Sequence, residues 1–302
     1  MLLEAEMQDR FAKYHPLVNF IYFALVIGFS MVLSHPLAQV ISFACALTYA
    51  IQTEGKKAVM FSLKWCLPMF LLTAFINPAF SHEGVTILTY LPGGNPLTLE
   101  SILYGLSAGL MLVTVLLWFT NFNRVITSDK FIYLFGRIIP AMSLVLSMTL
   151  RFIPKFKGQL AAVTDAQKCI GRDVSKGSLW HRTKIAVTIL SIMITWALEN
   201  AIETADSMKS RGYGLSGRTA FSIYRFEDRD KIALLFLGFC GLLLLAGSIS
   251  NAFGFLYFPR LRYVGINVVT MFFQFVYFSL CMMPVVLNWA EERKWKAIHS
   301  KM

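Results

Sequence analysis

The sequence predicts an all-α, polytopic membrane protein with about six transmembrane helices and a cytoplasmic domain of long helices. Two features of its composition indicate a membrane protein: 56% of the 302 residues are hydrophobic and only 15% are charged. Soluble domains carry about 25% charged residues. The third observation is that the apolar residues form separate runs near the length of a membrane span, while the basic residues collect between two of these runs.

A helix that crosses the hydrocarbon core of a bilayer needs about 20 mostly apolar residues. Six runs approach this length, at residues 17–33, 36–51, 58–76, 101–120, 232–249 and 264–287. The mixed charges before the first run are unlike those of a signal peptide, so we expect this run to remain as a span. The predicted domains are the first four spans (1–121), a middle segment (122–231), and the last spans with a basic tail (232–302).

The connection before the fourth span carries strand and turn signals. Residues 85–90 are rich in strand-forming side chains and precede a Pro- and Gly-containing stretch, which predicts a small hairpin. Thr98 and Glu100 are suited to cap the helix that follows. Within that helix, Gly105 and Gly109 form a small-xxx-small pair, which predicts close packing against another helix.

Basic residues predict the orientation in the membrane. Between Phe122 and Lys231 the chain carries 17 of its 28 Lys and Arg residues against nine acids, a net charge of +8 out of +11. Cytoplasmic connections of membrane proteins are enriched in Lys and Arg. We therefore expect a multi-pass protein of the cell membrane, with the middle segment and both termini in the cytoplasm. Arg260 and Arg262, between the last two spans, are exceptions to this rule.

The middle segment contains two predicted helices, at residues 151–170 and 181–209, because apolar residues recur there at helical spacing. The preceding run at 138–152 is about 15 residues long, which is short for a span, and we expect it to lie in the membrane interface. A basic surface beside membrane spans indicates an anionic lipid surface or an acidic protein partner, and makes nucleic acid the least favoured partner.

Both helices of the middle segment end in a glycine beside basic residues. In Ser210-Arg211-Gly212, the glycine fits the left-handed position that terminates a helix, and the arginine lies at the tip. A guanidinium held there can bind a carboxylate through two parallel hydrogen bonds. Ordinary capping explains one such end, whereas two in the same segment indicate a docking site. The corresponding residues of the first helix are Lys168, Ile170, Gly171 and Arg172.

Other side chains of these helices are candidate contacts with partner proteins. Glu203 and Asp206 share a stripe with Glu199, which indicates either a solvated face or a surface that pairs with basic residues. The apolar side of the helices is the other candidate surface. Its candidate contact residues are Phe156, Leu160, Trp196 and Met208.

The sequence offers no residues for chemistry of its own. The five histidines are dispersed, the spans carry no carboxylate relay, and no Gly-x4-Gly-Lys-Ser/Thr phosphate loop is present. The five cysteines lack the paired spacing of a zinc site or a disulfide framework. We therefore expect no catalytic or metal site. The alternatives are a membrane-embedded enzyme, which needs such a site, and a secondary carrier, which should show inverted repeats.

These residues resemble the transmembrane T component of energy-coupling factor transporters, the family that includes the Q protein of cobalt uptake systems. The most specific likeness is residues 205–214, which look like the second coupling helix with its Ala-Arg-Gly type signature, here Ser210-Arg211-Gly212. At the first signature Ile170 stands in place of the arginine, and Lys168 and Arg172 are candidate substitutes. The likeness also includes His15-Pro16-Leu17, Asn77-Pro78, Gly84-Val85-Thr86, Gly94-Asn95-Pro96, Thr98-Leu99-Glu100, Leu150-Arg151-Phe152-Ile153-Pro154 and Asp165-Ala166-Gln167.

The resemblance implies a non-catalytic scaffold of an ATP-driven importer for a vitamin or a metal ion. Two cytoplasmic ATPases, which bind ATP and Mg²⁺, would grip the two coupling helices, with Arg211 inserted into a groove of one ATPase. A separate substrate-binding S component in the membrane would rest on the apolar face of the same helices. This chain itself would need no cofactor.

Overall fold

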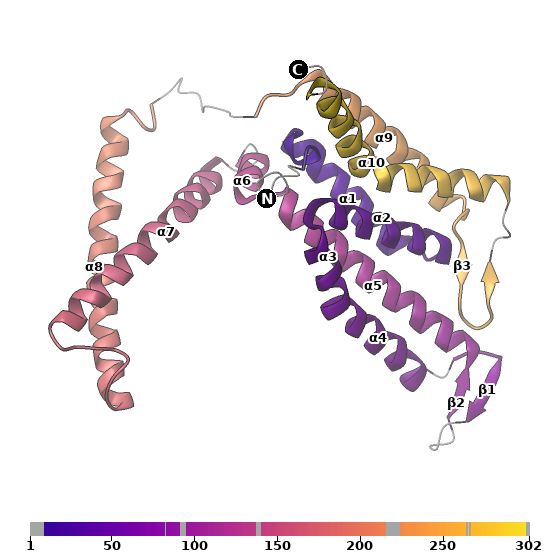
Figure 1. Ribbon diagram of the computed structural model, residues 1–302, viewed down its shortest axis with the longest axis horizontal. Coiled ribbons are helices and arrows are strands. Elements are labelled where there is room, and N and C mark those ends of the chain that lie inside the picture. The colour runs from indigo at the N-terminus through magenta and orange to yellow at the C-terminus, as the bar shows by residue number, and fades with distance from the viewer. Residues whose placement is uncertain are drawn as a thin grey trace. The chain divides into compact units, whose positions relative to one another are not determined.

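The computed structural model describes residues 9–81, 83–90, 95–136, 140–215, 224–263, 265 and 267–299 (Figure 1). The predictions for the first eight residues, for the turn at 91–94 and for Lys301 lie outside these ranges. Most of the described residues are helical, so the predicted all-α fold is confirmed. The helices are η1 (Phe11–Lys13), α1 (Pro16–Val32), α2 (Pro36–Glu54), α3 (Lys56–Phe61), the π-helix η2 (Ser62–Cys66), α4 (Leu67–Phe80), α5 (Leu99–Val125), α6 (Ser128–Gly136), α7 (Pro140–Cys169), α8 (Leu179–Ser210), α9 (Asp228–Ile249) and α10 (Val268–His299). The strands are β1 (Ile87–Tyr90), β2 (Pro96–Thr98), β3 (Phe255–Leu256) and β4 (Arg262–Tyr263).

The chain forms two compact units. The first, here called the transmembrane unit, contains the residues up to Phe131 and those from Tyr224 onward. The second, here called the two-helix unit, runs from Ile132 to Ile223 and contains α7 and α8. It is shorter at both ends than the predicted middle segment, 122–231. The reason is that the end of α5 and the first turn of α9 pack in the transmembrane unit.

Four of the six predicted spans are helices long and apolar enough to cross a membrane: Lys56–Phe80, which comprises α3, η2 and α4, then α5, α9 and α10. The other two, α1 and α2, are 17 and 19 residues long. Both start with a proline after a capping histidine. His15 Nδ1 accepts the Leu17 N–H at 3.2 Å, and His35 Nδ1 accepts the Leu37 N–H at 3.3 Å.

A fifth helix, α8, meets the same criterion of length and composition. The sequence predicted it as a non-spanning helix of the middle segment, on the pattern of one apolar face. The structure shows apolar side chains on two faces of α8, one packed against α7 and one exposed. Because of this second apolar face, α8 is as apolar overall as a membrane-spanning helix.

The core of the transmembrane unit is aromatic around η1. Phe11 is fully buried, and its ring centroid lies 5.0 Å from that of Tyr22 and 6.5 Å from that of Tyr49. Trp118 of α5 is also fully buried and donates its indole N–H to Ser42 Oγ of α2 at 2.9 Å. A polar group inside a helix bundle is thus paired with a side chain of a neighbouring helix, which fixes how the helices face each other.

The two glycines predicted to allow close helix packing lie against α4. A Cβ atom on Gly105 would be 2.9 Å from the carbonyl oxygen of Ala74, and one on Gly109 would be 3.0 Å from that of Phe70. Only a hydrogen fits in such a space, so α4 and α5 approach closely along these positions. The predicted close packing is confirmed, and the partner is α4.

The predicted hairpin before the fourth span is present, with β1 and β2 paired antiparallel. At the start of α5 the Thr98 hydroxyl accepts the N–H of Ser101 at 3.3 Å. The Glu100 carboxylate reaches back to the hairpin and accepts the N–H of Thr86 at 3.2 Å. The predicted cap is therefore confirmed, and Glu100 ties it to the strand connection.

In the two-helix unit, α7 runs for 30 residues from Pro140 to Cys169. The sequence predicted an interfacial helix at 138–152 and a separate helix at 151–170, and the structure joins their described parts into one. Pro154 lies inside this helix. A proline removes one backbone hydrogen bond but does not end a helix whose flanking turns continue the same pattern.

Candidate functional site: the ends of two long helices

The two long helices of the two-helix unit cross and pack through a small apolar cluster (Figure 1). Ile185, Ile189 and Met193 of α8 are buried, and they recur four residues apart on one face. Phe156 of α7 and Trp196 of α8 pack against them, with ring centroids 6.1 Å apart. This contact holds each helix so that its C-terminal end extends beyond the cluster.

The end of α8 is a complete Schellman motif. Arg211 is the C-cap residue, and Gly212 follows it with φ +76°. The N–H of Gly212 donates to the carbonyl oxygen of Lys209 at 2.9 Å, and the N–H of Tyr213 donates to that of Met208 at 3.0 Å. The backbone around Arg211 is therefore fixed, and its side chain starts from a defined point at the tip.

The end of α7 has the same backbone geometry. Gly171 has φ +80°, its N–H donates to the carbonyl oxygen of Lys168 at 3.0 Å, and the N–H of Arg172 donates to that of Gln167 at 2.9 Å. By this correspondence, Ile170 occupies the position that Arg211 occupies in α8. The two ends predicted from glycine and basic residues are thus equivalent in backbone and different in side chain.

The correspondence also places the two candidate substitutes for the missing arginine. Lys168 matches Lys209 of α8, two residues before the tip, and its Nζ lies 3.1 Å from the carboxylate of Asp165. Arg172 matches Tyr213, one residue beyond the glycine. Neither side chain starts from the tip position. Ile170, which does, is 63% exposed.

The loop after the α7 end is held by polar side chains. Asp173 accepts the N–H of Ser175 at 2.9 Å and its hydroxyl at 2.7 Å, and these hydrogen bonds lower the pKa of the Asp173 carboxyl group. Arg182 of α8 donates from Nε to the carbonyl oxygen of Val174 at 2.7 Å. The loop therefore joins the tip of α7 firmly to the first turns of α8.

The two tips lie at opposite ends of α8. The loop from the α7 tip leads directly into the start of α8, whereas Arg211 lies after its last turn. A helix of 32 residues is about 48 Å long at 1.5 Å per residue. The unit therefore presents two capped helix ends that are too far apart for one small groove to hold both.

The structure separates the remaining candidate contact residues into two groups. Phe156 and Trp196 are half-buried in the contact between α7 and α8. Leu160 is 41% exposed, Met208 is half-buried, and the carboxylates of Glu203 and Asp206 are exposed. Phe156 and Trp196 thus pack inside the unit with part of each side chain exposed, and the other four lie outside this cluster.

Sequence reasoning missed an exposed apolar stripe on α8. Its members recur three or four residues apart on the face opposite the buried cluster, and each is 53–64% exposed. The exposed stripe consists of Val187, Leu190, Ile194, Leu198 and Ile202. The sequence carries this stripe as a second set of apolar residues at helical spacing. The set on the buried face was by itself sufficient to predict the helix.

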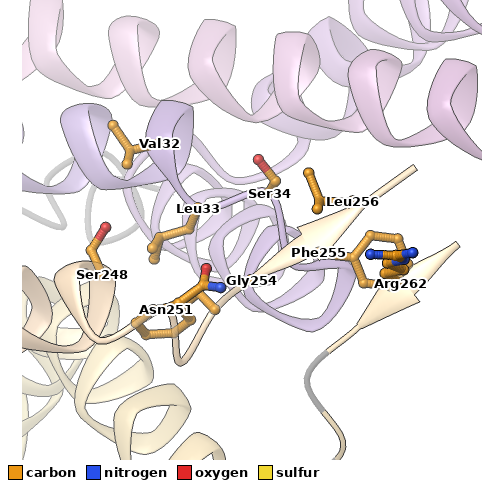
Figure 2. A pocket seen from close by; sticks show the side chains of 10 residues that line it. Val32, Leu33, Ser34, Ser248, Asn251, Gly254, Phe255, Leu256 and Arg262 are labelled. Atoms are coloured by element: carbon orange, nitrogen blue, oxygen red, sulfur yellow. The ribbon is translucent and has the colours of Figure 1, made fainter. Parts of the chain in front are cut away.

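A separate pocket of about 410 Å³ lies in the transmembrane unit, where the ends of α1 and α9 meet the β3–β4 hairpin (Figure 2). Arg262, an exception to the charge rule for orientation, lines this pocket together with Ser34 and Asn251. Two helix C-termini, with their partial negative charge, face the same region. In the part of the chain that the structure describes, no cluster of three His, Cys, Asp or Glu side chains is placed to hold a metal ion.

Comparison with known proteins identifies relatives of the chain. A sequence model of the cobalt transport protein family matches residues 14–221. The energy-coupling factor transporter transmembrane protein EcfT 1 of Listeria monocytogenes serotype 1/2a is 28% identical over 215 residues, which cover 66% of this chain and 79% of the relative. The EcfT of Staphylococcus aureus is 28% identical over 204 residues, 63% of this chain and 75% of the relative. That of Lactobacillus helveticus is 35% identical over 109 residues, 35% of this chain and 39% of the relative.

The family match includes both long helices and both of their capped ends. It extends over more than half of the chain, and the relatives carry the name of the component that the sequence resembled. The predicted resemblance to the transmembrane T component of energy-coupling factor transporters is confirmed. The chain therefore belongs to the cobalt transport protein family.

Proposed function

We propose that the chain is the scaffold through which two ATPases drive substrate uptake by a separate membrane-embedded S component. The observation that carries this proposal is the pair of exposed, glycine-capped helix ends with one backbone geometry. It is supported by relatives that are named as transmembrane proteins of energy-coupling factor transporters.

Each tip contacts one ATPase. Arg211 projects its guanidinium into a groove lined by carboxylates, where two parallel hydrogen bonds give both affinity and direction. The α7 tip presents Ile170 instead, which suits an apolar part of the second groove, with Arg172 at the rim. The separation of the tips along α8 supports contact with two subunits rather than one.

The S component rests on the exposed stripe of α8. Five large apolar side chains there are more than half exposed, which is unfavourable in water and suitable against lipid or a membrane helix. The closed and the open ATPase pair would each bind a different arrangement of the two tips most tightly. This difference in affinity moves α7 and α8 and shifts the S component between its states.

The chain performs no reaction itself in this scheme. ATP and Mg²⁺ are bound by the partner ATPases, and the substrate, a vitamin or a metal ion, by the S component. The chain lies in the cell membrane, with the middle segment at its cytoplasmic face and interface and both termini in the cytoplasm. A secondary carrier or an enzyme acting alone is not favoured, because the relatives are components of an energy-coupling factor transporter.

The test is purification of the tagged chain from its native membrane, followed by reconstitution of the purified complex in lipid vesicles. We expect two ATPase subunits and an S component to co-purify. Uptake should require ATP on the side of the vesicle membrane where the ATPases lie. Uptake by the chain without ATPases would contradict the proposal and favour a carrier. Turnover of a substrate by the chain alone would favour an enzyme.

A further inference from the structure

The N-terminal segment Asp9–His15 contacts both connections between the two units. The chain leaves the transmembrane unit after Phe131 and returns to it at Tyr224. Asp129, just before the chain leaves, and Tyr224, where it returns, are near enough for the Asp129 carboxylate to add to the burial that raises the pKa of Tyr224. The described residues at which the chain leaves and re-enters the transmembrane unit therefore lie in the same part of this unit.

The leaving connection is held by Lys130 in the first turn of α6. Lys130 is 7% exposed, and its Nζ donates to the carbonyl oxygen of Val125 at 2.8 Å and to that of Ala12 in η1. The amide of Asn19, with its oxygen turned toward the ammonium, accepts a third hydrogen bond at 3.2 Å. Burial lowers the pKa of Lys130 to about 8, and the charge of Asp9 acts in the opposite direction.

The returning connection is held by the other end of the same segment. The N–H of His15 donates to Asp230 Oδ1 at 3.0 Å, and Asp230 is only 1% exposed. The His15 ring also packs edge-on against Phe226, with centroids 4.9 Å apart. The guanidinium of Arg229 lies 5.3 Å from the ring centroid of Tyr14.

The segment itself is fixed to two helices of the transmembrane unit. Asp9 accepts hydrogen bonds from the hydroxyl of Tyr49 in α2 and from Asn288 Nδ2 in α10, the latter at 3.0 Å. The N–H of Phe11 donates to Asn288 Oδ1 at 3.0 Å. The same seven residues thus join α2 and α10 to the leaving and the returning connection.

We infer that Asp9–His15 is a clasp that transmits motion of the two-helix unit to the transmembrane helices, with Lys130 and Asp230 as its positioning residues. Buried charged contacts add little net stability over well-packed apolar side chains, although the loss of one partner alone is destabilising. Their value here is that they specify where the two connections are held. The inference rests on the proposed function, since it concerns how ATP-driven motion reaches the membrane helices.

The experiment uses the complete transporter, with its ATPases and S component, in lipid vesicles. It measures the amount of substrate taken up per ATP hydrolysed for Lys130→Met and Asp230→Asn. Lys231→Met and Asp228→Asn are matched controls, because these two exposed residues form an ion pair within the same turn of α9. We expect each clasp variant to lower uptake per ATP about tenfold, with ATPase co-purification unchanged, and the controls to stay within about twofold.

A double variant distinguishes a shared clasp from two independent contacts. If Lys130 and Asp230 act through one segment, uptake per ATP in the double variant falls no further than in the worse single variant. Multiplied losses, or an unchanged uptake per ATP in both single variants, would overturn the inference. If both single variants fail to reach the membrane, Tyr14→Leu decides, since it keeps an apolar side chain, removes the ring contacts with Arg229 and Phe11, and must lower uptake per ATP by about twofold. Failure of the proposed function is a separate result, in which the unaltered complex shows no ATP-driven uptake.

Discussion

The tips of α7 and α8 have the same backbone and different side chains. Each ends in a glycine at positive φ, and in each the N–H groups of this glycine and of the next residue donate to carbonyl oxygens of the last turn. The residue at the tip is Ile170 in one and Arg211 in the other. The difference shows that the glycine determines where the tip side chain starts, while the residue before the glycine determines which surface it can bind.

The first prediction tests the tip that carries the charge. Arg211→Glu should weaken ATPase association by about 3 kcal/mol, roughly a hundredfold, because a carboxylate then faces the carboxylates that the guanidinium would bind. Co-purification of ATPases and ATP-driven uptake in vesicles measure this loss. Lys209→Glu is the matched control: it has the same charge change two residues earlier and should change both measurements less than threefold. Normal uptake by Arg211→Glu would contradict the assignment of this tip.

The second prediction separates the tips from the exposed stripe. Ile194→Lys places a charge in the middle of the apolar surface and should reduce uptake about tenfold by disfavouring the S component. ATPase co-purification should stay at its original level. Thr204→Lys, on an exposed part of α8 about 80° away around the helix, is the control. Equal effects of the two substitutions would mean that the stripe is an ordinary lipid-facing surface.

The third prediction concerns the glycines that make the tips equivalent. An L-residue at positive φ costs about 1–2 kcal/mol, so Gly171→Ala and Gly212→Ala should both lower the melting temperature. A Cβ atom added at Gly212 would also lie 3.1 Å from Leu215 Cδ1, whereas one added at Gly171 would have no neighbouring atom within 4 Å. Gly212→Ala should therefore be the more harmful. Gly158→Ala, inside α7 with open space around it, should be neutral or stabilising.

The fourth prediction is the smallest and acts on the tip that lacks the arginine. Ile170→Arg makes the α7 tip resemble the α8 tip and should leave uptake intact, with ATPase association unchanged or tightened a few-fold. Titration of the detergent-solubilised chain with purified ATPases measures it. Loss of assembly in this variant would mean that the second groove requires an apolar side chain. That result would make the two tips specific for different partners.

Much of the fold and both tips could be predicted from the sequence. Gly212 and Gly171 each follow a helical pattern and precede its loss, which is sufficient to locate a C-cap without a structure. Gly105 and Gly109 predicted a close contact by a different signal. Two small residues at helical spacing in a span allow the backbone of another helix to approach.

The remainder depends on contacts between distant parts of the chain. The exposed stripe of α8 has the same period as its buried face, and a sequence alone does not tell which face meets α7. The N-terminal clasp joins Ala12 to Lys130 and His15 to Asp230, pairs separated by more than a hundred residues. Two backbone groups of ordinary turns take part in these contacts, so no residue pattern could reveal them.

Site-specific photo-cross-linking from the two tips in native membranes measures directly whether the tips bind the ATPases. A photoreactive side chain is placed at position 170, at position 211, or at the mid-helix control position 158. We expect cross-links to an ATPase subunit from positions 170 and 211 and none from position 158. Cross-links from position 158 alone, or from none of the three while the ATPases co-purify, would contradict this expectation.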